Sequence, residues 1–312
     1  MAKIITVTAN TAVDFCIEVD GLLKRQNIVA NHSSDYACGK GINVARALAA
    51  LKIPCTCLGF VGRQSLGPFL AIESAMLHTD FTVIEGKTRT NITLYDIADN
   101  SETHIRTSGF TVTDNACQNL LDKLAEQVQS GDLVIFSGSL PPGAPDDFHA
   151  ALIEQCHRQS AIPFLDSSGS SLLAGLKARP LLIKPNQQEL EEITGQTLHD
   201  AKAVAAAARA IVDQGIAWVY VSRGAEGLVA VGEQFALTAR VSNIPKNILS
   251  HVGCGDALLA GVAAACIAGL DLQETIKSGM ACATANLYTR EPGRLAADLL
   301  PGFQANCEIH EI

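Results

Sequence analysis

The chain has 312 residues, of which 48% are hydrophobic and 18% are charged, so it carries enough apolar material for a substantial core and too little charge for a disordered chain. Its net charge of −9 argues against nucleic acid and anionic membranes as partners, because either would require a basic face. No apolar run reaches the roughly 18 residues of a membrane span, and the first residues lack the features of a signal peptide. Ten cysteines are scattered through apolar segments, where we expect reduced thiols. These features predict a cytoplasmic protein.

From about residue 43 onward, short apolar runs such as LVIF and WVYV alternate with helical patterns. One helix is expected from about Thr113 to Gln129, with Thr113 as its N-cap, and another from about Ala201 to Gln214. This alternation predicts an α/β fold with a mostly parallel central sheet and helices on both faces.

Two stretches, about 10–37 and 87–108, break this alternation. Their segments, such as TNITLYDIA and ETHIRTS, have the pattern of half-exposed antiparallel strands, and we expect them to pair as a small β-sheet lid. Because the chain shows no internal repeat and no linker-like composition, we predict a single domain over residues 1–312. Ligands of open parallel sheets bind at the carboxyl ends of the strands, so the loops there are expected to hold the chemistry.

The segment HVGCGDALLAG places glycines on both sides of Cys254, directly before a helix expected to begin at Asp256. Free backbone N–H groups at such a helix start, together with the helix dipole, form a site for negative charge. Asp256 taken alone is more simply interpreted as a helix cap. The paired glycines favour a phosphate pressed against the backbone instead. The segment is not a dinucleotide-binding fingerprint, since Leu258 stands where that motif needs its last small residue.

Three further segments are ambiguous when taken singly. GKGINVARAL places Lys40 and Asn43 at a helix start, but it lacks the Ser or Thr and the first glycine of a Walker A motif. KPNQQE puts Asn186 and Glu189 three residues apart, which suits either a water-rich Mg²⁺ site or a helix cap. SRGAEG is compatible with a nucleotide-binding loop or with a hairpin turn, and SGS (137–139) ends a buried strand with hydroxyls that can bind a sugar.

In their order and spacing these motifs resemble the ribokinase-like carbohydrate kinases, also called the PfkB family. TANTAVD at 8–14 resembles the family's TLNPAxD start, GKGINVAR its GGKGxNVAR, and GKTRTN its GxTRxN. SGSLPPG, DSSG, KPNQQE, SRGAEG and VGCGDALLAG follow in the family's order, so the resemblance extends to about residue 270. The combination of TRTN, SGSLPPG and DSSG is similar to the branch that acts on phosphorylated sugars, which includes 1-phosphofructokinase and tagatose-6-phosphate kinase.

The resemblance implies a ribokinase-like fold and a role for each matching position. Asp256 would be the catalytic base, beside an anion hole formed by the amides of Gly253, Cys254 and Gly255. The residues implied at the sugar are Asp14, Gly39, Asn43 and Ser139, with Lys40 and Arg89 toward its phosphate. Those implied at ATP are Ser222, Gly224, Gly227 and Asn186. Asn186 and Glu189 together would organise Mg²⁺. The positions that depart from the family pattern are Thr11, Cys38, Gln188, His251, Cys254 and Ala257.

The implied activity is ATP-dependent phosphorylation of a hydroxyl on a ketohexose monophosphate, in a homodimer formed through the lid. Two alternatives share the fold: a kinase of an unphosphorylated sugar, and a non-catalytic sensor of sugar phosphates or nucleotides. Without the resemblance, Arg89 in the middle of its strand would be interpreted as a solvated edge charge. A dinucleotide-dependent oxidoreductase is disfavoured, because no G-x-G-x-x-G follows the first strand.

Overall fold

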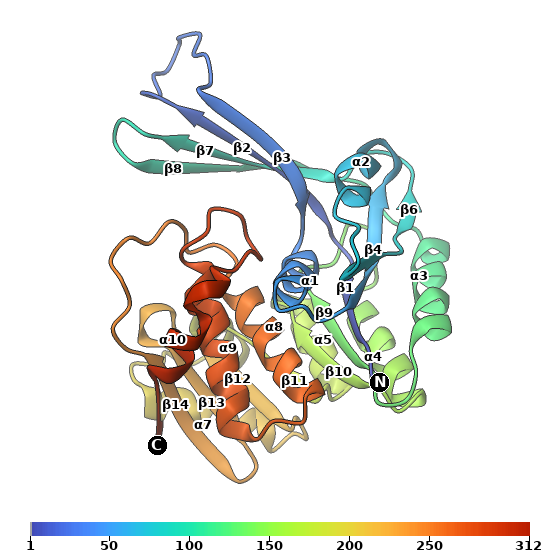
Figure 1. The fold of residues 1–312 in the computed structure, drawn as a ribbon. Helices are drawn as coiled ribbons and strands as arrows, with labels where there is room; N and C mark the ends of the chain where they lie inside the picture. The colour runs from blue at the N-terminus through green and yellow to red at the C-terminus, as the bar shows by residue number, and fades with distance from the viewer. Residues whose placement is uncertain (1) are drawn as a thin grey trace.

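The computed structural model describes residues 2–312 and shows an 11-stranded main sheet in the order β15-β14-β13-β12-β11-β10-β9-β1-β4-β5, with β6 also paired to β4 (Figure 1). All pairs from β5 to β12 are parallel, and those from β12 to β15 are antiparallel. The strands of the main sheet are β1 (Ile4–Thr8), β4 (Cys55–Gly62), β5 (Leu77–Thr79), β6 (Thr82–Ile84), β9 (Leu133–Ser137), β10 (Ile162–Asp166), β11 (Leu182–Ile183), β12 (Trp218–Ser222), β13 (Leu228–Gly232), β14 (Phe235–Val241) and β15 (Cys307–Glu311).

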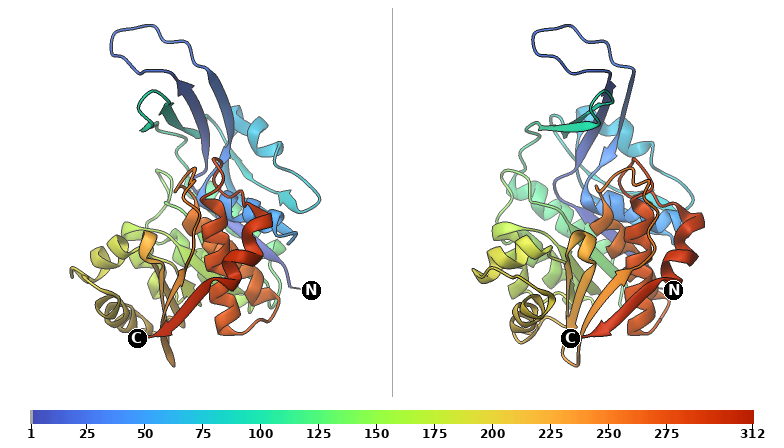
Figure 2. Two further views of the ribbon diagram at one scale, coloured as in Figure 1. Left: turned by 60° about the vertical axis from the view of Figure 1, so that its left-hand side comes forward. Right: turned by 90° about the vertical axis from the view of Figure 1, so that its left-hand side faces the viewer.

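Helices cover both faces of this sheet, as the views in Figures 1 and 2 show. The helices on one face are α1 (Lys40–Ala50), α8 (Cys254–Ile267), α9 (Leu272–Asn286) and α10 (Leu300–Ala305). Those on the other face are α3 (Asp114–Gln127), α4 (Phe148–Arg158), α5 (Gly169–Lys177), α6 (Gln187–Thr194) and α7 (Ala201–Val212). The short helices that complete the fold are α2 (Leu66–Leu70), η1 (Arg63–Ser65), η2 (Gly224–Glu226) and η3 (Ala297–Leu299).

Alternating strand residues separate the core into two layers. Ile4 and Ile135 pack in the cluster with α1, α8 and α9, whereas Ile5 and Val134 pack in the cluster with α3 to α7. All four are fully buried, and full burial of such a side chain stabilises the fold by roughly 1.5–3 kcal/mol. Continuous apolar strands therefore follow from a sheet that is covered on both sides.

The helices expected to start at about Thr113 and Ala201 begin as predicted, but their predicted ends are slightly too long. Thr113 caps α3, because its hydroxyl accepts a hydrogen bond from the amide of Ala116 at 3.3 Å. α3 ends at Gln127, since Val128 is already extended, and α7 ends at Val212. Among the helices of residues 2–312, none has the length and apolar character that crossing a membrane requires. The ten cysteines are free thiols.

A separate four-stranded sheet projects from the main body (Figures 1 and 2). Its strands, in the order β3-β2-β7-β8, are β2 (Ala12–Val19), β3 (His32–Cys38), β7 (Arg89–Asp96) and β8 (Ser101–Arg106). The outer pairs are antiparallel as expected, but the expectation was wrong for the central pair, because β2 and β7 are parallel. The reason is that β2 follows β1 and β7 follows β6, and both leave the main sheet in the same direction. The α/β fold with a mostly parallel sheet and a small additional sheet is confirmed.

Candidate active site

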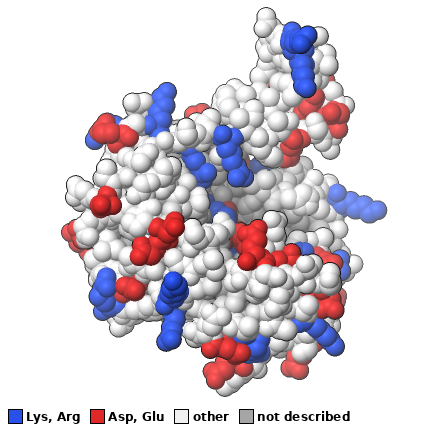
Figure 3. All heavy atoms as spheres, turned by 180° about the vertical axis from the view of Figure 1, so that it is seen from behind, with Lys and Arg blue, Asp and Glu red and all other residues white. Residues whose placement is uncertain are grey.

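Polar and charged residues gather where neighbouring strands of the main sheet end. Asp166 is the last residue of β10, Ser222 is the last of β12, and Lys184 follows β11 directly. The start of α8 lies beside the same edge, because a Cβ atom at Gly255 would come within 3.0 Å of the Lys184 ammonium nitrogen. From behind, the molecule is hollowed where the projecting sheet meets the body, and side chains of both charges border the hollow (Figure 3). The strand ends therefore form the candidate site.

Helix α8 begins at Cys254, two residues before the expected start at Asp256. Gly253 is the N-cap residue, with a left-handed φ of 88°, and no side chain caps the helix. Asp256 therefore lies inside the first turn, and its interpretation as a cap is wrong. The first N–H groups of a helix have no intrahelical partners, so the amides of Cys254, Gly255 and Asp256 can bind an anion.

The Asp256 carboxylate is buried and has one well-defined partner. The side-chain amide of Asn43, on α1, donates a hydrogen bond of 2.8 Å to its Oδ2 atom. Burial raises the pKa of Asp256 to about 6, the neighbouring charge of Asp166 adds to this rise, and Lys40, Asn43 and Lys184 oppose it. A pKa near neutral suits a group that accepts and releases a proton during a reaction.

Two charged residues that the sequence interpretation did not assign lie at the centre of the site. Asp166 is 1% exposed, and its Oδ1 atom binds the ammonium groups of Lys40 at 3.1 Å and Lys184 at 3.4 Å. Burial pushes the Asp166 pKa upward, but the two lysines outweigh burial and hold the pKa below its ordinary value. The charge of Asp166 in turn raises the pKa of Lys40. Lys40 is therefore cationic at neutral pH.

Lys184 joins this cluster to the start of α8. A Cβ atom at Gly255 would lie 3.0 Å from the Lys184 ammonium nitrogen, so the glycine makes room for the cation. Lys184 is 5% exposed, and a buried ammonium beside free helix amides strengthens the attraction for an anion. A signal for both missed residues was present, because each is a charged residue directly after an apolar strand run, in PFLD and LLIK.

The predicted sugar residues lie on both sides of the junction between the small sheet and α1. Asp14 on β2 is nearly buried and accepts a hydrogen bond of 2.8 Å from the Asn91 amide on β7. Gly39 precedes α1 with φ 143°, and a Cβ there would come within 2.6 Å of the Thr8 side chain. A pocket of about 180 Å³ lies beside Asp14, with Asn91 in its wall.

Arg89 is the first residue of β7, and not a mid-strand position as the sequence suggested. Its guanidinium donates to the backbone carbonyls of Asn10 at 3.0 Å and Thr11 at 3.3 Å. The Asn10 side chain in turn donates to the Ser139 hydroxyl at 3.1 Å. Arg89 and Ser139 are thus brought together through Asn10. Burial lowers the pKa of Arg89, so the group is not a freely solvated edge charge.

The predicted nucleotide residues Ser222, Gly224 and Gly227 line one cavity of about 570 Å³. Cys254 and Gly255 line it as well, so it reaches the start of α8. The SRGAEG segment is a hairpin turn between β12 and β13, and it also lines the cavity. Its role at a nucleotide remains a prediction. Much of the remaining wall is apolar, with contributions from Ile244, Ile248, Leu258, Met280 and Leu287.

Asn186 and Glu189 form a reciprocal cap at the start of α6. The Asn186 Oδ1 atom accepts from the Glu189 amide at 2.8 Å, and the Glu189 Oε2 atom accepts from the Asn186 amide at 2.8 Å. Each residue thus uses one oxygen for the helix. Within residues 2–312, no group of three or more His, Cys, Asp or Glu side chains is placed to hold a metal ion. A role for the pair at a metal remains a prediction.

Comparison with known proteins agrees with this geometry. The family model for pfkB family carbohydrate kinases matches residues 2–295. The chain belongs to the pfkB carbohydrate kinase family. It is 32% identical to a 1-phosphofructokinase of Bacillus subtilis over 304 residues (96% of this chain, 97% of the relative) and 39% identical to a 1-phosphofructokinase of Xanthomonas campestris over 266 residues (84% and 83%). Its fold is similar to that of phosphofructokinase-2 from Escherichia coli, with a TM-score of 0.91, 24% identity and coverage of 98% and 99%.

As a pfkB carbohydrate kinase, the chain needs a place for a sugar and a place for ATP. The pocket beside Asp14 has several polar side chains in its wall, including Asn91 and Thr93, whereas the cavity beside Gly224 combines glycines with a largely apolar wall. Asp256 is hydrogen-bonded to Asn43 on α1, and its neighbour Gly255 lines the cavity beside Gly224.

Proposed function

We propose that this pfkB kinase transfers the γ-phosphate of ATP to a hydroxyl of a ketohexose monophosphate, with Asp256 as general base. The observation that carries the proposal is the position of Asp256. It is a buried carboxylate with a pKa near 6, in the first turn of α8, directly after Gly255, which lines the larger cavity. The two curated relatives described above, both named 1-phosphofructokinase, support the choice of a phosphorylated ketose.

In the proposed reaction, Asp256 accepts the proton of the sugar hydroxyl while the oxygen forms a bond to the γ-phosphorus, and ADP leaves with the electrons of the broken bond. Asn43 holds one carboxylate oxygen, which leaves Oδ1 to accept the proton. The amides of Cys254, Gly255 and Asp256 and the Lys184 ammonium face the charge that develops on the phosphoryl group. Lys40, paired with Asp166, adds a second cation beside it.

Magnesium would be held near the ATP phosphates by Glu189 and Asn186, acting through water. The residues present fit such an ion, because Asp166 has a buried Oδ2 atom without a hydrogen-bond partner among residues 2–312 and the Glu189 Oε1 atom is not used by the cap. Carboxylate and amide oxygens with retained waters are the surroundings that Mg²⁺ prefers. When bound, the ion neutralises the phosphate charge and so favours attack.

We assign the sugar phosphate to Arg89 and Ser139. Arg89 uses its Nε and one Nη atom for the carbonyls of residues 10 and 11, which fixes the plane of the guanidinium. The other nitrogen can then donate to a phosphate. The exposed Ser139 hydroxyl is near, because it accepts a hydrogen bond from the side chain of Asn10, whose carbonyl binds Arg89. Charge-assisted hydrogen bonds of this kind contribute roughly 1.5–3 kcal/mol each.

Steady-state ADP release tests the proposal with fructose 1-phosphate, fructose 6-phosphate, tagatose 6-phosphate and the free ketoses. We expect strong preference for a phosphorylated ketose, and we expect Arg89→Ala to remove most of that preference while the KM for ATP changes little. Arg89→Lys should be intermediate, since an ammonium cannot reproduce the planar geometry. Equal use of the free ketose by the wild-type protein would favour a kinase of an unphosphorylated sugar. Absence of ADP release with every sugar, despite ATP binding, would favour a sensor.

The small sheet would act as a lid that excludes water, and its exposed edge would form a homodimer interface in the cytoplasm, where ATP is available. All side chains of the edge strand β8 are exposed, and Ile105 on that strand and Val29 in the β2–β3 connection are exposed apolar residues. An exposed edge strand is a template for pairing with a second chain. Light scattering of the wild type and of Ile105→Lys tests the interface. If the interface forms through this edge, the variant should have a lower molar mass in solution, closer to that of a monomer.

A further inference from the structure

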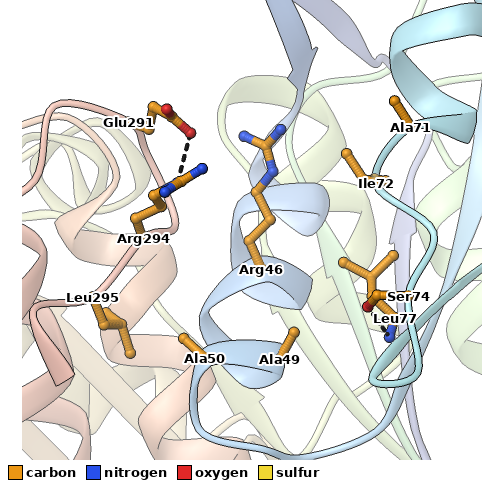
Figure 4. Close-up of a pocket in the computed structure, with 10 residues that line it drawn as sticks. All are labelled: Arg46, Ala49, Ala50, Ala71, Ile72, Ser74, Leu77, Glu291, Arg294 and Leu295. Atoms are coloured by element: carbon orange, nitrogen blue, oxygen red, sulfur yellow. Dashed lines mark hydrogen bonds and ion pairs between the residues drawn. The ribbon is translucent and has the colours of Figure 1, made fainter.

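A cavity of about 480 Å³ lies between α1, the segment that follows α2 and residues 291–295, and no residue assigned above lines it (Figure 4). Its walls carry two arginines, Arg46 from α1 and Arg294 from the 291–295 segment. Arg46 is part of the GKGINVAR motif, but the proposed reaction gives this residue no role. This cavity is large enough for a small organic ligand.

Arg46 has a nitrogen that lacks an acceptor. Its Nη1 atom is buried and makes no hydrogen bond within residues 2–312. The guanidinium lies over the Tyr36 ring, 5.4 Å from the ring centre, and this stacking leaves the N–H groups at its edge available. A buried charged donor without an acceptor is costly, and an anionic oxygen in the cavity would remove that cost.

Arg294 supplies a second cation with part of its guanidinium engaged. Its Nε atom is paired with the Glu291 Oε2 atom at 2.7 Å. Two arginines and one carboxylate give the cavity wall a formal charge of +1, in a chain whose net charge is −9. Figure 4 shows Arg46 extending from α1 toward the end of the cavity where Glu291 and Arg294 lie, with Ala49, Ala50 and Leu295 at the other end.

We propose that this cavity binds a small phosphate-bearing molecule, with the phosphate between Arg46 and Arg294 and any organic part against the alanines and Leu295. Guanidinium groups recognise phosphate by parallel hydrogen bonds, and the short apolar wall accepts a few carbon atoms but no charged group. The site is separate from Asp256 and from the nucleotide cavity, because the residues that line the two cavities do not overlap.

Occupancy of this site is coupled to the sugar pocket through two shared elements. Tyr36, under the Arg46 guanidinium, lines the pocket beside Asp14. Pro292 lines that pocket too, while its neighbour Glu291 lines the arginine cavity. A ligand that fixes Arg46 and the 291–295 segment therefore also fixes two walls of the sugar pocket. This coupling step rests on the proposed function, whereas the binding step does not.

Calorimetric titration or a concentration-dependent thermal shift with inorganic phosphate and with glycerol 3-phosphate tests the binding step. We expect Arg294→Gln to weaken binding about 10–100-fold, while Arg63→Gln leaves it unchanged. Arg63 is the matched control, because it forms a similar exposed ion pair with Glu85 at 2.6 Å, away from this cavity. Tighter binding of the ester assigns the site to a phosphorylated metabolite, and equal binding assigns it to free phosphate. Binding that survives Arg294→Gln and is lost in Arg89→Ala would place the anion at the sugar end and overturn the proposal.

Kinetics test the coupling step separately. With glycerol 3-phosphate at saturation, the KM for the ketose phosphate should shift by about fivefold or more in the wild type, and Arg294→Gln should abolish the shift. An unchanged KM in the wild type, together with confirmed binding, would overturn the coupling alone. If the protein proves not to be a kinase, the titrations still decide whether the cavity binds phosphate.

Discussion

Asn43 and Asp256 lie 213 residues apart in the chain, and the structure joins their side chains by a hydrogen bond of 2.8 Å. Asn43 is in the first turn of α1 and Asp256 is in the first turn of α8, so the bond holds two helix starts together at the edge of the main sheet. Its donor is an amide and its acceptor is one oxygen of a buried carboxylate. The bond therefore orients the carboxylate without neutralising it.

Asp256→Asn should lower turnover about 10²–10⁴-fold, the range for removing a general base, and leave ATP binding nearly intact. An amide oxygen at position 256 still accepts the hydrogen bond from Asn43, so the fold and the helix start are preserved. Steady-state kinetics and ATP titration measure both effects. A variant that keeps more than about a third of wild-type turnover would contradict the assignment of the base.

The pH profile of kcat/KM should fall on the acid side of about pH 6, because Asp256 accepts a proton only when it is ionised and burial raises its pKa to about 6. Below that pH we expect a loss of about tenfold per unit. The residual activity of Asp256→Asn should lack this acidic limb. An acidic limb of the same midpoint in the variant would assign the titration to another group.

Ionisation of Asp256, which the reaction needs, should lower the stability of the fold. The folded-state pKa of Asp256 is raised from 3.8 to about 6, so its contribution to stability is fully present below pH 3.8 and is lost as the pH rises through 6. Asp256→Asn should therefore raise the Tm at pH 8, and the gain should shrink toward pH 5. Thermal unfolding at the two values measures this. A gain independent of pH would mean that the charge of Asp256 is not the cause.

Lys184→Met should lower kcat about 10²–10³-fold, as expected for the loss of one group that faces the developing charge. Asp166 keeps its contact with Lys40, so the fold retains one partner for the buried carboxylate. Lys177→Met, at an exposed position on α5, serves as the control and should behave as wild type. A lower Tm with unchanged kcat would restrict Lys184 to a structural role.

Glu189→Ala should lose both activity and stability, because the carboxylate closes the cap of α6 as well as facing the proposed ion. Loss of such a cap costs about 0.5–2 kcal/mol. Glu189→Gln separates the two roles, since glutamine retains the cap but not the charge. We expect both variants to regain part of their activity at high Mg²⁺. Wild-type kinetics in Glu189→Gln would leave only the capping role.

The sequence predicted those parts of the site that local chemistry determines. Glycines at 253 and 255 and the polar residue Asn43 are recognisable at helix starts, whatever the rest of the chain does. Asp166 and Lys184 were missed because the importance of each depends on the other, and their pairing arises from the adjacency of β10 and β11. Sheet order is a tertiary property, and no local pattern records it.

The sequence also did not predict the direction of strand pairing or the direction of one key side chain. The alternation in TNITLYDIA predicted a half-exposed strand, but it carries no information about the parallel pairing of β7 with β2. The sequence likewise placed Arg89 in a strand without indicating that its guanidinium binds the carbonyls of residues 10 and 11. Both features follow from how two segments leave the main sheet, which only the assembled fold determines.

The small sheet is built from two excursions of the chain, and its central contact, from Asn91 to Asp14, joins residues 77 apart. Such a pairing can form only after the main sheet has brought the starts of β2 and β7 together. Before that, the entropy cost of closing the loop between them is not offset by other contacts. We therefore expect the small sheet to fold last and to open first, as a locally unfolding unit of low free energy. Amide hydrogen exchange should be fastest in β3 and β8 and slow in β1 and β9. Repeated opening of this unit would then admit and release ligands while the rest of the molecule stays folded.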